Sequence, residues 1–188
     1  MHNLSLIIFT LMIQTSVGVF GASIFNSWIN KTEIVQIPLI ILSTCLGFIA
    51  LGLISATAHL GNLKHAHHAV FNIKSSWLSR EIISINLFGA SVVLLWILTF
   101  SGFQKGLFII ETASIILGIL TVSTMGQVYR LRTVPVWNSI ATPLDFFGST
   151  LLTGGVVSGT LNLLISGKTY SPCLIFLMCS FIGLCLKI

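Results

Sequence analysis

The stretch IISINLFGASVVLLWILTF at residues 82–100 contains no charged side chain. As a helix, a run of this length crosses the roughly 30 Å hydrocarbon core of a bilayer. Lipid offers the peptide backbone no hydrogen-bond partner, so a segment that spans it must satisfy its own N–H and C=O groups as a helix. The stretch therefore predicts a transmembrane helix, immediately preceded by Arg80 and Glu81.

Five further apolar runs of similar length, each with at most one charged residue, surround this stretch. The composition agrees with membrane insertion: 55% of residues are hydrophobic and 7% are charged, whereas soluble domains carry roughly a quarter charged residues. We therefore expect an all-α integral membrane protein, with residues 1–188 forming a single transmembrane domain. It is predicted to be a bundle of about six helices, at residues 4–28, 34–58, 82–100, 106–128, 144–166 and 171–186.

The basic residues are unevenly divided between the two ends of this predicted bundle. Six of the nine Lys and Arg residues fall on the side of the amino terminus, and three fall on the other side. The excess predicts that the amino terminus and the loop after the second span face the cytoplasm. A basic surface that docks a partner protein would give the same distribution, so both interpretations stay open. The first group is Lys64, Lys74, Arg80, Arg130, Arg132 and Lys187, and the second is Lys31, Lys105 and Lys168.

Several function classes are disfavoured by the sequence. The net charge of +5 is spread too thinly for nucleic-acid binding. The predicted third to sixth spans contain no histidine, which argues against a bis-histidine haem, and the four cysteines form no C-x-x-C motif. His65, His67 and His68 form an H-x-H-H pattern with no nearby acid or cysteine, so a solvated or partner-contacting loop is favoured over a metal site. We expect no metal and no bound cofactor in this chain.

The loop between the second and third spans nevertheless concentrates the ionisable groups of the chain. His59 ends the second predicted span and Glu81 begins the third. An imidazole titrates near neutral pH. An imidazole and a carboxylate flanking an apolar cleft would suit the two-proton, two-electron oxidation of a quinol. The alternative is that Glu81 only stabilises the first turn of its helix and that His59 is an interface residue.

Other polar residues near span ends are open to two interpretations. Glu111 and Asp145 lie near span starts, where an acid is either functional or solvated at the interface. A basic and aromatic turn on the same side as the His-rich loop contains Tyr129, Arg130, Arg132 and Trp137. It could close the cleft or dock a partner, or it could be a loop that sets topology. No nucleophile triad, P-loop or metalloprotease motif is present.

Two motifs lie in order along the chain. Residues 59–82 contain HLGNLKHA and then NIKSSWLSREI, and residues 128–143 read VYRLRTVPVWNSIATP. Together they resemble the signatures of the dimethyl sulfoxide reductase membrane-anchor family. The resemblance covers about 40 residues. It implies about eight spans, so this chain is expected to be short of the last two.

The resemblance also implies a function. It suggests a multi-pass anchor in the bacterial inner membrane that takes part in anaerobic respiration and electron transport. The anchor would oxidise menaquinol and pass electrons to a four-cluster iron–sulfur subunit, and so to a molybdopterin catalytic subunit. The anchor itself would be non-catalytic toward the oxide and would carry no redox cofactor.

The resemblance ties two residues of this sequence, His59 and Glu81, to quinol binding. They are the pair already favoured on chemical grounds. Gly61, Lys64 and Arg80 belong to the same motif and are predicted to contribute to the quinol site more weakly. The rival class is a small membrane transporter or a passive assembly subunit without quinol chemistry.

Overall fold

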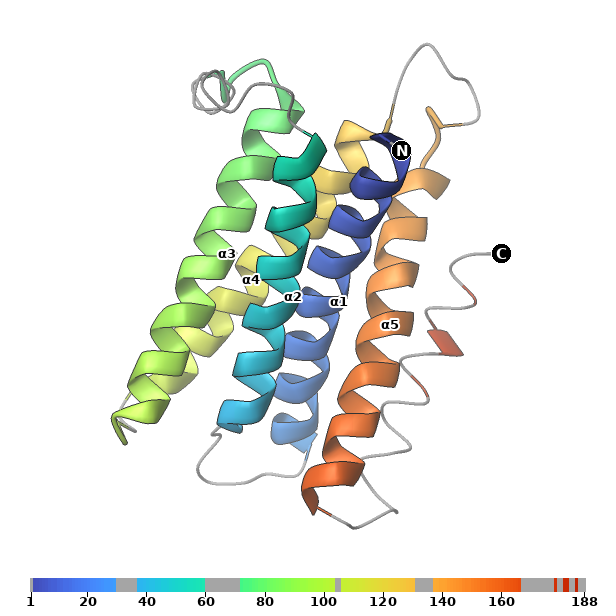
Figure 1. Cartoon of the computed structure of the whole chain (residues 1–188). Coiled ribbons are helices and arrows are strands. Elements are labelled where there is room, and N and C mark those ends of the chain that lie inside the picture. Colours follow the sequence, from blue (N-terminus) through green and yellow to red (C-terminus); the bar gives the residue numbers. More distant parts are fainter. Residues whose placement is uncertain are drawn as a thin grey trace.

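The computed structural model describes residues 2–29, 37–59, 72–103, 106–130 and 137–166, together with 178, 181, 182 and 185. These residues form five long α-helices (Figure 1). Their bounds are α1 (His2–Ile29), α2 (Leu39–His59), α3 (Trp77–Phe100), α4 (Leu107–Val128) and α5 (Ala141–Ser166).

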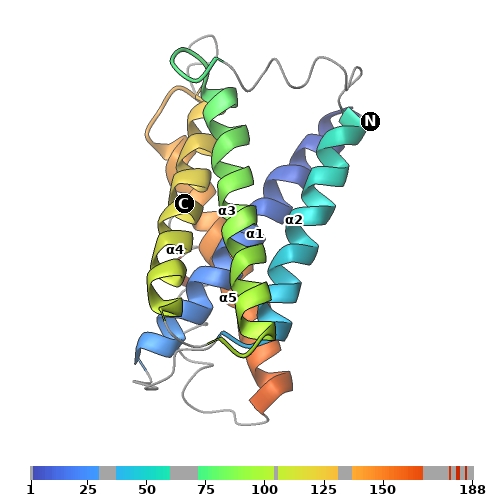
Figure 2. The same ribbon diagram turned by 90° about the vertical axis from the view of Figure 1, so that its left-hand side faces the viewer.

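Consecutive helices run in opposite directions. Figures 1 and 2 show α1, α3 and α5 starting at the upper end of the bundle, where α2 and α4 finish. The main packing partners are α1 with α2 and α5, and α3 with α4. Short connections between antiparallel neighbours are the expected arrangement for an up-and-down bundle. We call the upper end the Glu81 end, because Glu81 lies in the second turn of α3 there.

The prediction of an all-α membrane protein is confirmed, with a correction to the number of spans. All five helices are long and apolar enough to cross a membrane. Five candidate spans are thus found in the described part of the chain, where six were predicted. The predicted sixth span, residues 171–186, lies outside the described residues except at four positions.

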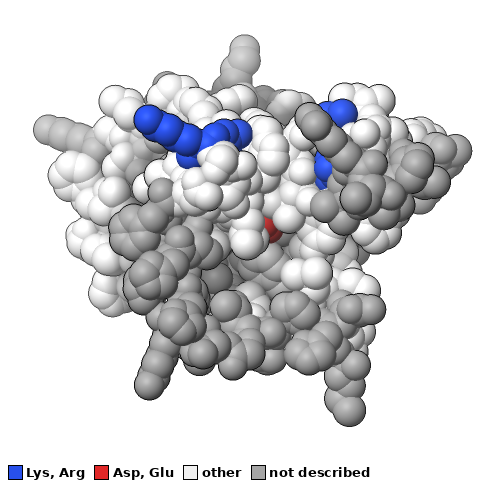
Figure 3. All heavy atoms as spheres, turned by 90° about the horizontal axis from the view of Figure 1, so that it is seen from above, with Lys and Arg blue, Asp and Glu red and all other residues white. Residues whose placement is uncertain are grey.

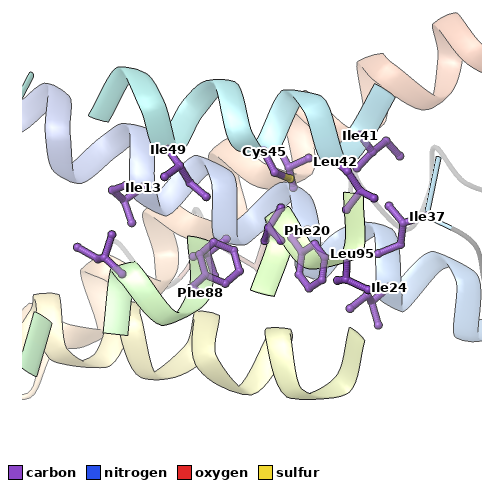
Figure 4. Close-up of a cluster of buried hydrophobic side chains, with 14 of the residues drawn as sticks. Ile13, Phe20, Ile24, Ile37, Ile41, Leu42, Cys45, Ile49, Phe88 and Leu95 are labelled. Atoms are coloured by element: carbon purple, nitrogen blue, oxygen red, sulfur yellow. The ribbon is translucent and has the colours of Figure 1, made fainter. Parts of the chain in front are cut away.

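The bundle has an apolar core, and several serine, threonine, glutamine and glutamate side chains are buried beside it. Phe20 of α1 and Phe88 of α3 meet edge to face near its centre, with ring centroids 5.9 Å apart (Figure 4). Glycines allow α1 and α5 to touch, since a Cβ atom at Gly18 would overlap the backbone of Thr150 and Gly154. Such small-residue contacts are a common basis of helix association in membranes.

The turn between α3 and α4 depends on glycine. After the C-cap Ser101, Gly102 has φ 74°, its N–H bonds to the Thr99 carbonyl, and the Phe103 N–H bonds to the Leu98 carbonyl. This is a Schellman-type ending, in which a left-handed residue satisfies the last carbonyls of the helix. The turn reverses the chain at the end of the bundle opposite Glu81.

Candidate functional site: the Glu81 end of the bundle

The start of α3 brings Glu81 into the bundle. The side chain of Ser76 caps the helix by accepting a hydrogen bond from the Ser79 N–H at 3.3 Å, as serine does at helix starts. The helix therefore begins at Trp77, whereas the sequence predicted a start at Ile82. The prediction was wrong because it excluded charged residues from the span. Glu81 consequently lies beyond the first turn of α3.

Glu81 is buried rather than exposed at an interface. Its exposed fraction is 3%. It lies three residues before Ser84, on the same face of α3. The hydroxyl of Ser84 is 3.0 Å from the hydroxyl of Thr124 in α4. This hydrogen bond fixes the relative height of the two helices just below Glu81.

Tyr129 joins this cluster from the end of α4. It is the C-cap residue of the helix, four residues after the fully buried Met125. Its ring packs on Phe146 of α5, with centroids 5.2 Å apart. Burial and, second, the negative charge of Glu81 raise the pKa of the Tyr129 phenol to about 12. Tyr129 therefore carries its proton and lies within the electrostatic reach of Glu81.

The junction of α4 and α5 holds Tyr129 in place. Gly126 lies against Pro143, so that a Cβ atom on Gly126 would be 2.9 Å from the Cα and 3.0 Å from the Cβ of Pro143. Only a glycine allows the backbones to approach this closely without displacement. The contact sets the end of α4 against the first turn of α5, where Phe146 supports the tyrosine ring.

Arg80, the neighbour of Glu81, is engaged in a different set of contacts. Its guanidinium lies 4.3 Å from the ring centre of Trp77. Its Nε donates to the Ile73 carbonyl and its Nη2 to the Lys74 carbonyl, both at 2.8 Å. These contacts tie the turn before α3 to the helix. They favour a structural role, and quinol binding by Arg80 stays a prediction.

Of the predicted site residues not yet mentioned, the structure places His59 at the end of a described helix. His59 is the last residue of α2, at the Glu81 end (Figure 1), and its side chain is not described. Gly61, Lys64 and Arg132 lie outside the described residues. The helix bounds therefore bring His59 and Glu81 to one end of the bundle, as predicted. That their side chains flank one cleft stays a prediction.

The predicted docking residues are described in part. Trp137 is 49% exposed, and its carbonyl accepts a hydrogen bond from the Thr142 hydroxyl at 2.7 Å. Arg130 is half-buried, and its N–H bonds to the Gln127 carbonyl where α4 ends. An exposed tryptophan and a basic residue are both typical of an interface, and docking by these residues stays a prediction.

Seen from above, the Glu81 end has a basic rim and a recessed acid. Figure 3 shows lysine and arginine atoms on the outer part of this face, and acidic atoms only inside a hollow between other side chains. The described basic residues at this end are Lys74, Arg80 and Arg130. The charge pattern places positive groups where an anionic partner or lipid head group would approach.

The two other acids near span starts differ from each other. Asp145 is exposed, which fits interfacial solvation. Glu111 is 2% exposed, so interfacial solvation does not account for it. Its carboxylate accepts a hydrogen bond from the Ile37 N–H, and Oε2 has no hydrogen-bond partner among the described residues.

Sequence reasoning did not relate two polar residues to the buried acid or to the bundle interior. Tyr129 was predicted to belong to the basic and aromatic turn, but nothing in the sequence relates its ring to Glu81. Gln14 was not singled out, although it is the sole glutamine within the first apolar run. It is 3% exposed in α1, and its Oε1 has no hydrogen-bond partner among the described residues. A lone amide in a span was the available signal.

A cavity of about 340 Å³ lies deeper in the bundle, between α1, α4 and α5. Its lining is almost entirely apolar, and none of the predicted site residues contributes to it. An apolar cavity offers no group that accepts a proton. Within the described ranges, no group of three His, Cys, Asp or Glu side chains could hold a metal ion. The cluster of His65, His67 and His68 lies outside those ranges.

Comparison with known proteins gives one consistent family. A model of the family described as "DMSO reductase anchor subunit (DmsC)" matches residues 1–186. The sequence is 28% identical over 167 residues to the C chain of the anaerobic dimethyl sulfoxide reductase of Haemophilus influenzae, across 84% of this chain and 58% of that protein. It is 35% identical over 122 residues to the Escherichia coli protein of the same name, across 62% of this chain and 42% of that protein.

A third relative is the YnfH chain of an anaerobic dimethyl sulfoxide reductase of Escherichia coli. It is 28% identical over 163 residues, across 85% of this chain and 57% of that protein. The chain thus spans about half the length of the curated relatives it matches. No solved structure matches it.

Proposed function

Because the chain belongs to the family of DMSO reductase anchor subunits (DmsC), we propose that it oxidises menaquinol at the Glu81 end of the bundle. The electrons pass to an iron–sulfur subunit and then to a molybdopterin subunit that reduces an S- or N-oxide. The chain is a multi-pass membrane protein, and we place it in the bacterial inner membrane. It binds no redox cofactor of its own in this proposal.

The observation that carries the proposal is the burial of Glu81. A glutamate whose only task is to stabilise a helix start lies in the first turn and in water. Glu81 lies beyond the first turn and is 3% exposed. A buried acid inside a membrane protein is costly, so its position indicates a function.

The chemistry requires a proton acceptor for each ring hydroxyl of the quinol. Oxidation of one quinol releases two electrons and two protons. The carboxylate of Glu81 accepts one proton as the ring hydroxyl loses it, and the imidazole of His59 accepts the other. Both electrons leave through the iron–sulfur subunit. The buried position of Glu81 holds the quinol ring away from water, which strengthens the hydrogen bonds to it.

The basic rim supports a partner at the same end. An iron–sulfur subunit must approach the quinol site closely to receive electrons. Lys74, Arg80 and Arg130 belong to this end of the bundle, and Figure 3 shows lysine and arginine atoms on the same face as the recessed acidic atoms. Positive charge there steers an acidic partner surface to this end. The same argument favours partner docking over membrane topology as the explanation for the excess of Lys and Arg residues at this end.

The test is the variant Glu81→Gln in the assembled complex, with Asp145→Asn as the matched control. Oxide reduction is measured twice, with a quinol donor and with an artificial donor that feeds the partner subunits directly. We expect Glu81→Gln to lower only the quinol-driven rate, by on the order of 10²-fold or more. The exposed Asp145→Asn should leave both rates unchanged. Equal loss of both rates in Glu81→Gln would favour the alternative, a passive assembly subunit.

A further inference from the structure

The cavity between α1, α4 and α5 opens onto the outer surface of the described bundle, at the depth of the hydrocarbon core. Ile119 of α4 and Phe25 of α1 line it and are 48% and 46% exposed. Its α4 lining runs from Ile115 to Val122, in the middle of the helix. An apolar lining gives water too few hydrogen-bond partners, so the cavity takes apolar groups from its surroundings.

Both α4 and α5 rest on α1, and this holds them apart along the cavity. A Cβ atom on Gly118 would lie 3.0 Å from the Cγ1 of Val17, and one on Gly18 would overlap the backbone of α5. Nearer the Glu81 end, α4 and α5 meet where Gly126 contacts Pro143. Below this contact the cavity separates them, and α1 forms its floor.

The cavity is too narrow for another helix and wide enough for one hydrocarbon chain. Seven residues of α4 separate Ile115 from Val122, a length of about 10 Å. A volume of about 340 Å³ over this length gives a mean cross-section of about 34 Å². A helix with its side chains is about 10–12 Å wide, a cross-section of about 80 Å² or more. A single carbon chain, at contact distances of about 4 Å, needs about 20 Å².

A positive charge continues the cavity face of α4 toward the Glu81 end. Ile115, Ile119, Val122, Gly126 and Arg130 recur at intervals of three or four residues, so they share one side of α4 and of the turn that ends it. Fifteen residues separate Ile115 from Arg130, a length of about 22 Å. One leaflet of a bilayer, with its head groups, is about 20–22 Å thick. Arg130 therefore lies at the height of the head group of a lipid whose chain ends in the cavity.

Exposed apolar residues connect the cavity with this end along α5. Leu144 and Ile140 precede the lining residue Phe147 by three and seven residues, so all three lie on one side of the helix. Both Leu144 and Ile140 are exposed. Trp137, also exposed before α5, is of the residue type enriched at the membrane surface. An alkyl chain can therefore run from the surface into the cavity against apolar side chains.

We propose that the cavity and Arg130 bind one anionic phospholipid, with an acyl chain in the cavity and the phosphate paired with the Arg130 guanidinium. The cavity admits a chain and not a helix, and the residue at the height of the head group is basic. A guanidinium pairs with phosphate oxygens through two N–H groups. The bound lipid packs on α1, α4 and α5 together and stabilises the bundle from its outer side. The proposal goes beyond quinol oxidation and does not depend on it.

The test compares two lipids on the 188-residue chain in detergent by native mass spectrometry. Dioleoylphosphatidylglycerol and dioleoylphosphatidylcholine have the same chains and differ in the charge of the head group. We expect one phosphatidylglycerol to bind per chain, about 5-fold more strongly than phosphatidylcholine, because a basic residue near the surface contributes a preference of this size. Equal binding of the two lipids would overturn the proposal. No retained lipid would also overturn it, in favour of an apolar protein segment as the occupant.

The head-group contact is tested by Arg130→Gln, which should abolish the preference for the anionic lipid while both lipids still bind. The matched control is Lys74→Gln. It removes a positive charge at the same end but before α3, and the described lining of the cavity includes no residue of α3. This control should keep the preference of about 5-fold. An equal loss of preference in both variants would show an effect of net charge alone and overturn the assignment to Arg130.

The chain contact is tested by Ala22→Phe, which fills the cavity from its floor in α1. We expect binding of both lipids to fall by about 10-fold, because the acyl chain loses its contacts with the cavity walls. Ala50→Phe adds the same ring at an exposed position of α2 and should bind both lipids as wild type does. Should Ala22→Phe fail to fold, Ile119→Trp narrows the cavity from its open edge and should have the same effect. Unchanged lipid binding in the folded cavity variant would overturn the proposal.

Discussion

Two buried glutamates lie at opposite ends of this bundle, and their surroundings differ. Glu111 is 2% exposed and bonds to the Ile37 N–H, just before the start of α2. Glu81 is almost equally buried, but the Ser84 and Thr124 hydroxyls lie close below it, toward the bundle interior. Burial alone therefore does not identify a proton-handling carboxyl. The neighbouring groups decide between a role in joining helices and a role in moving protons.

Shortening each glutamate by one methylene should separate these roles most strongly. Glu81→Asp keeps the charge but withdraws the carboxyl from the quinol by more than 1 Å, a displacement that costs up to about 10²-fold in rate. We expect quinol-driven turnover to fall by about 10- to 100-fold. Glu111→Asp should change it by less than about 2-fold. Steady-state rates of the two assembled complexes make the comparison, and equal losses would contradict it.

A bulkier side chain between α4 and α5 at the Glu81 end should have the next largest effect. In Gly126→Val the new side chain would overlap Pro143 and separate α4 from α5. Overpacking of this kind costs about 1–3 kcal/mol, and it should displace the end of α4 at the Glu81 end and lower quinol-driven kcat by about 10-fold. Gly47→Ala is the control, because a Cβ atom at Gly47 meets nothing within 4 Å. Thermal unfolding in detergent and kcat should both stay at wild-type values for Gly47→Ala.

Removal of the Glu111 carboxyl should affect stability and leave quinol chemistry unchanged. In Glu111→Ala the Ile37 N–H loses its acceptor, and an unsatisfied buried donor costs about 1–3 kcal/mol. We expect a lower unfolding temperature and a lower yield of complex. Turnover per assembled complex should remain the same with either electron donor. A selective loss of quinol turnover would show that Glu111 also handles protons.

The smallest effect concerns the hydrogen bond that sets the register of α3 and α4. Ser84→Ala removes the contact of 3.0 Å to Thr124, and such interhelical bonds in membranes average about 0.6 kcal/mol. A change of this size is measurable in a denaturant or thermal titration. Thr112→Val, which removes an exposed hydroxyl bonded only within α4, provides the baseline. A decrease of more than about 2 kcal/mol in the free energy of unfolding would mean that Ser84 stabilises the bundle through more than this hydrogen bond.

The sequence predicted the parts of this arrangement that depend on local pattern. Apolar runs located the five described helices to within a few residues, and the parity of the spans placed His59 and Glu81 at one end. The start of α3 was predicted too late because the search for a span counted only uncharged residues. The first two turns of α3 contain Arg80 and Glu81. The N-cap Ser76 was the local signal for that start.

The features that the sequence could not predict depend on packing between helices. A functional role and interfacial solvation were equally consistent with the position of Glu111 in the sequence, and its burial excludes the second. The position of the end of α4 relative to Glu81 depends on the α3–α4 register and on the Gly126–Pro143 contact. Both are contacts between helices, and no periodic pattern in the sequence predicts them.

The most direct test of the central claim compares Glu81→Gln with Glu111→Gln in the assembled complex. For each, the quantity measured is the ratio of the quinol-driven rate to the artificial-donor rate. The proposed function predicts that this ratio falls by on the order of 10²-fold in Glu81→Gln and stays near the wild-type value in Glu111→Gln. An unchanged ratio in Glu81→Gln, or an equal fall in both variants, would contradict the assignment of quinol oxidation to the Glu81 end.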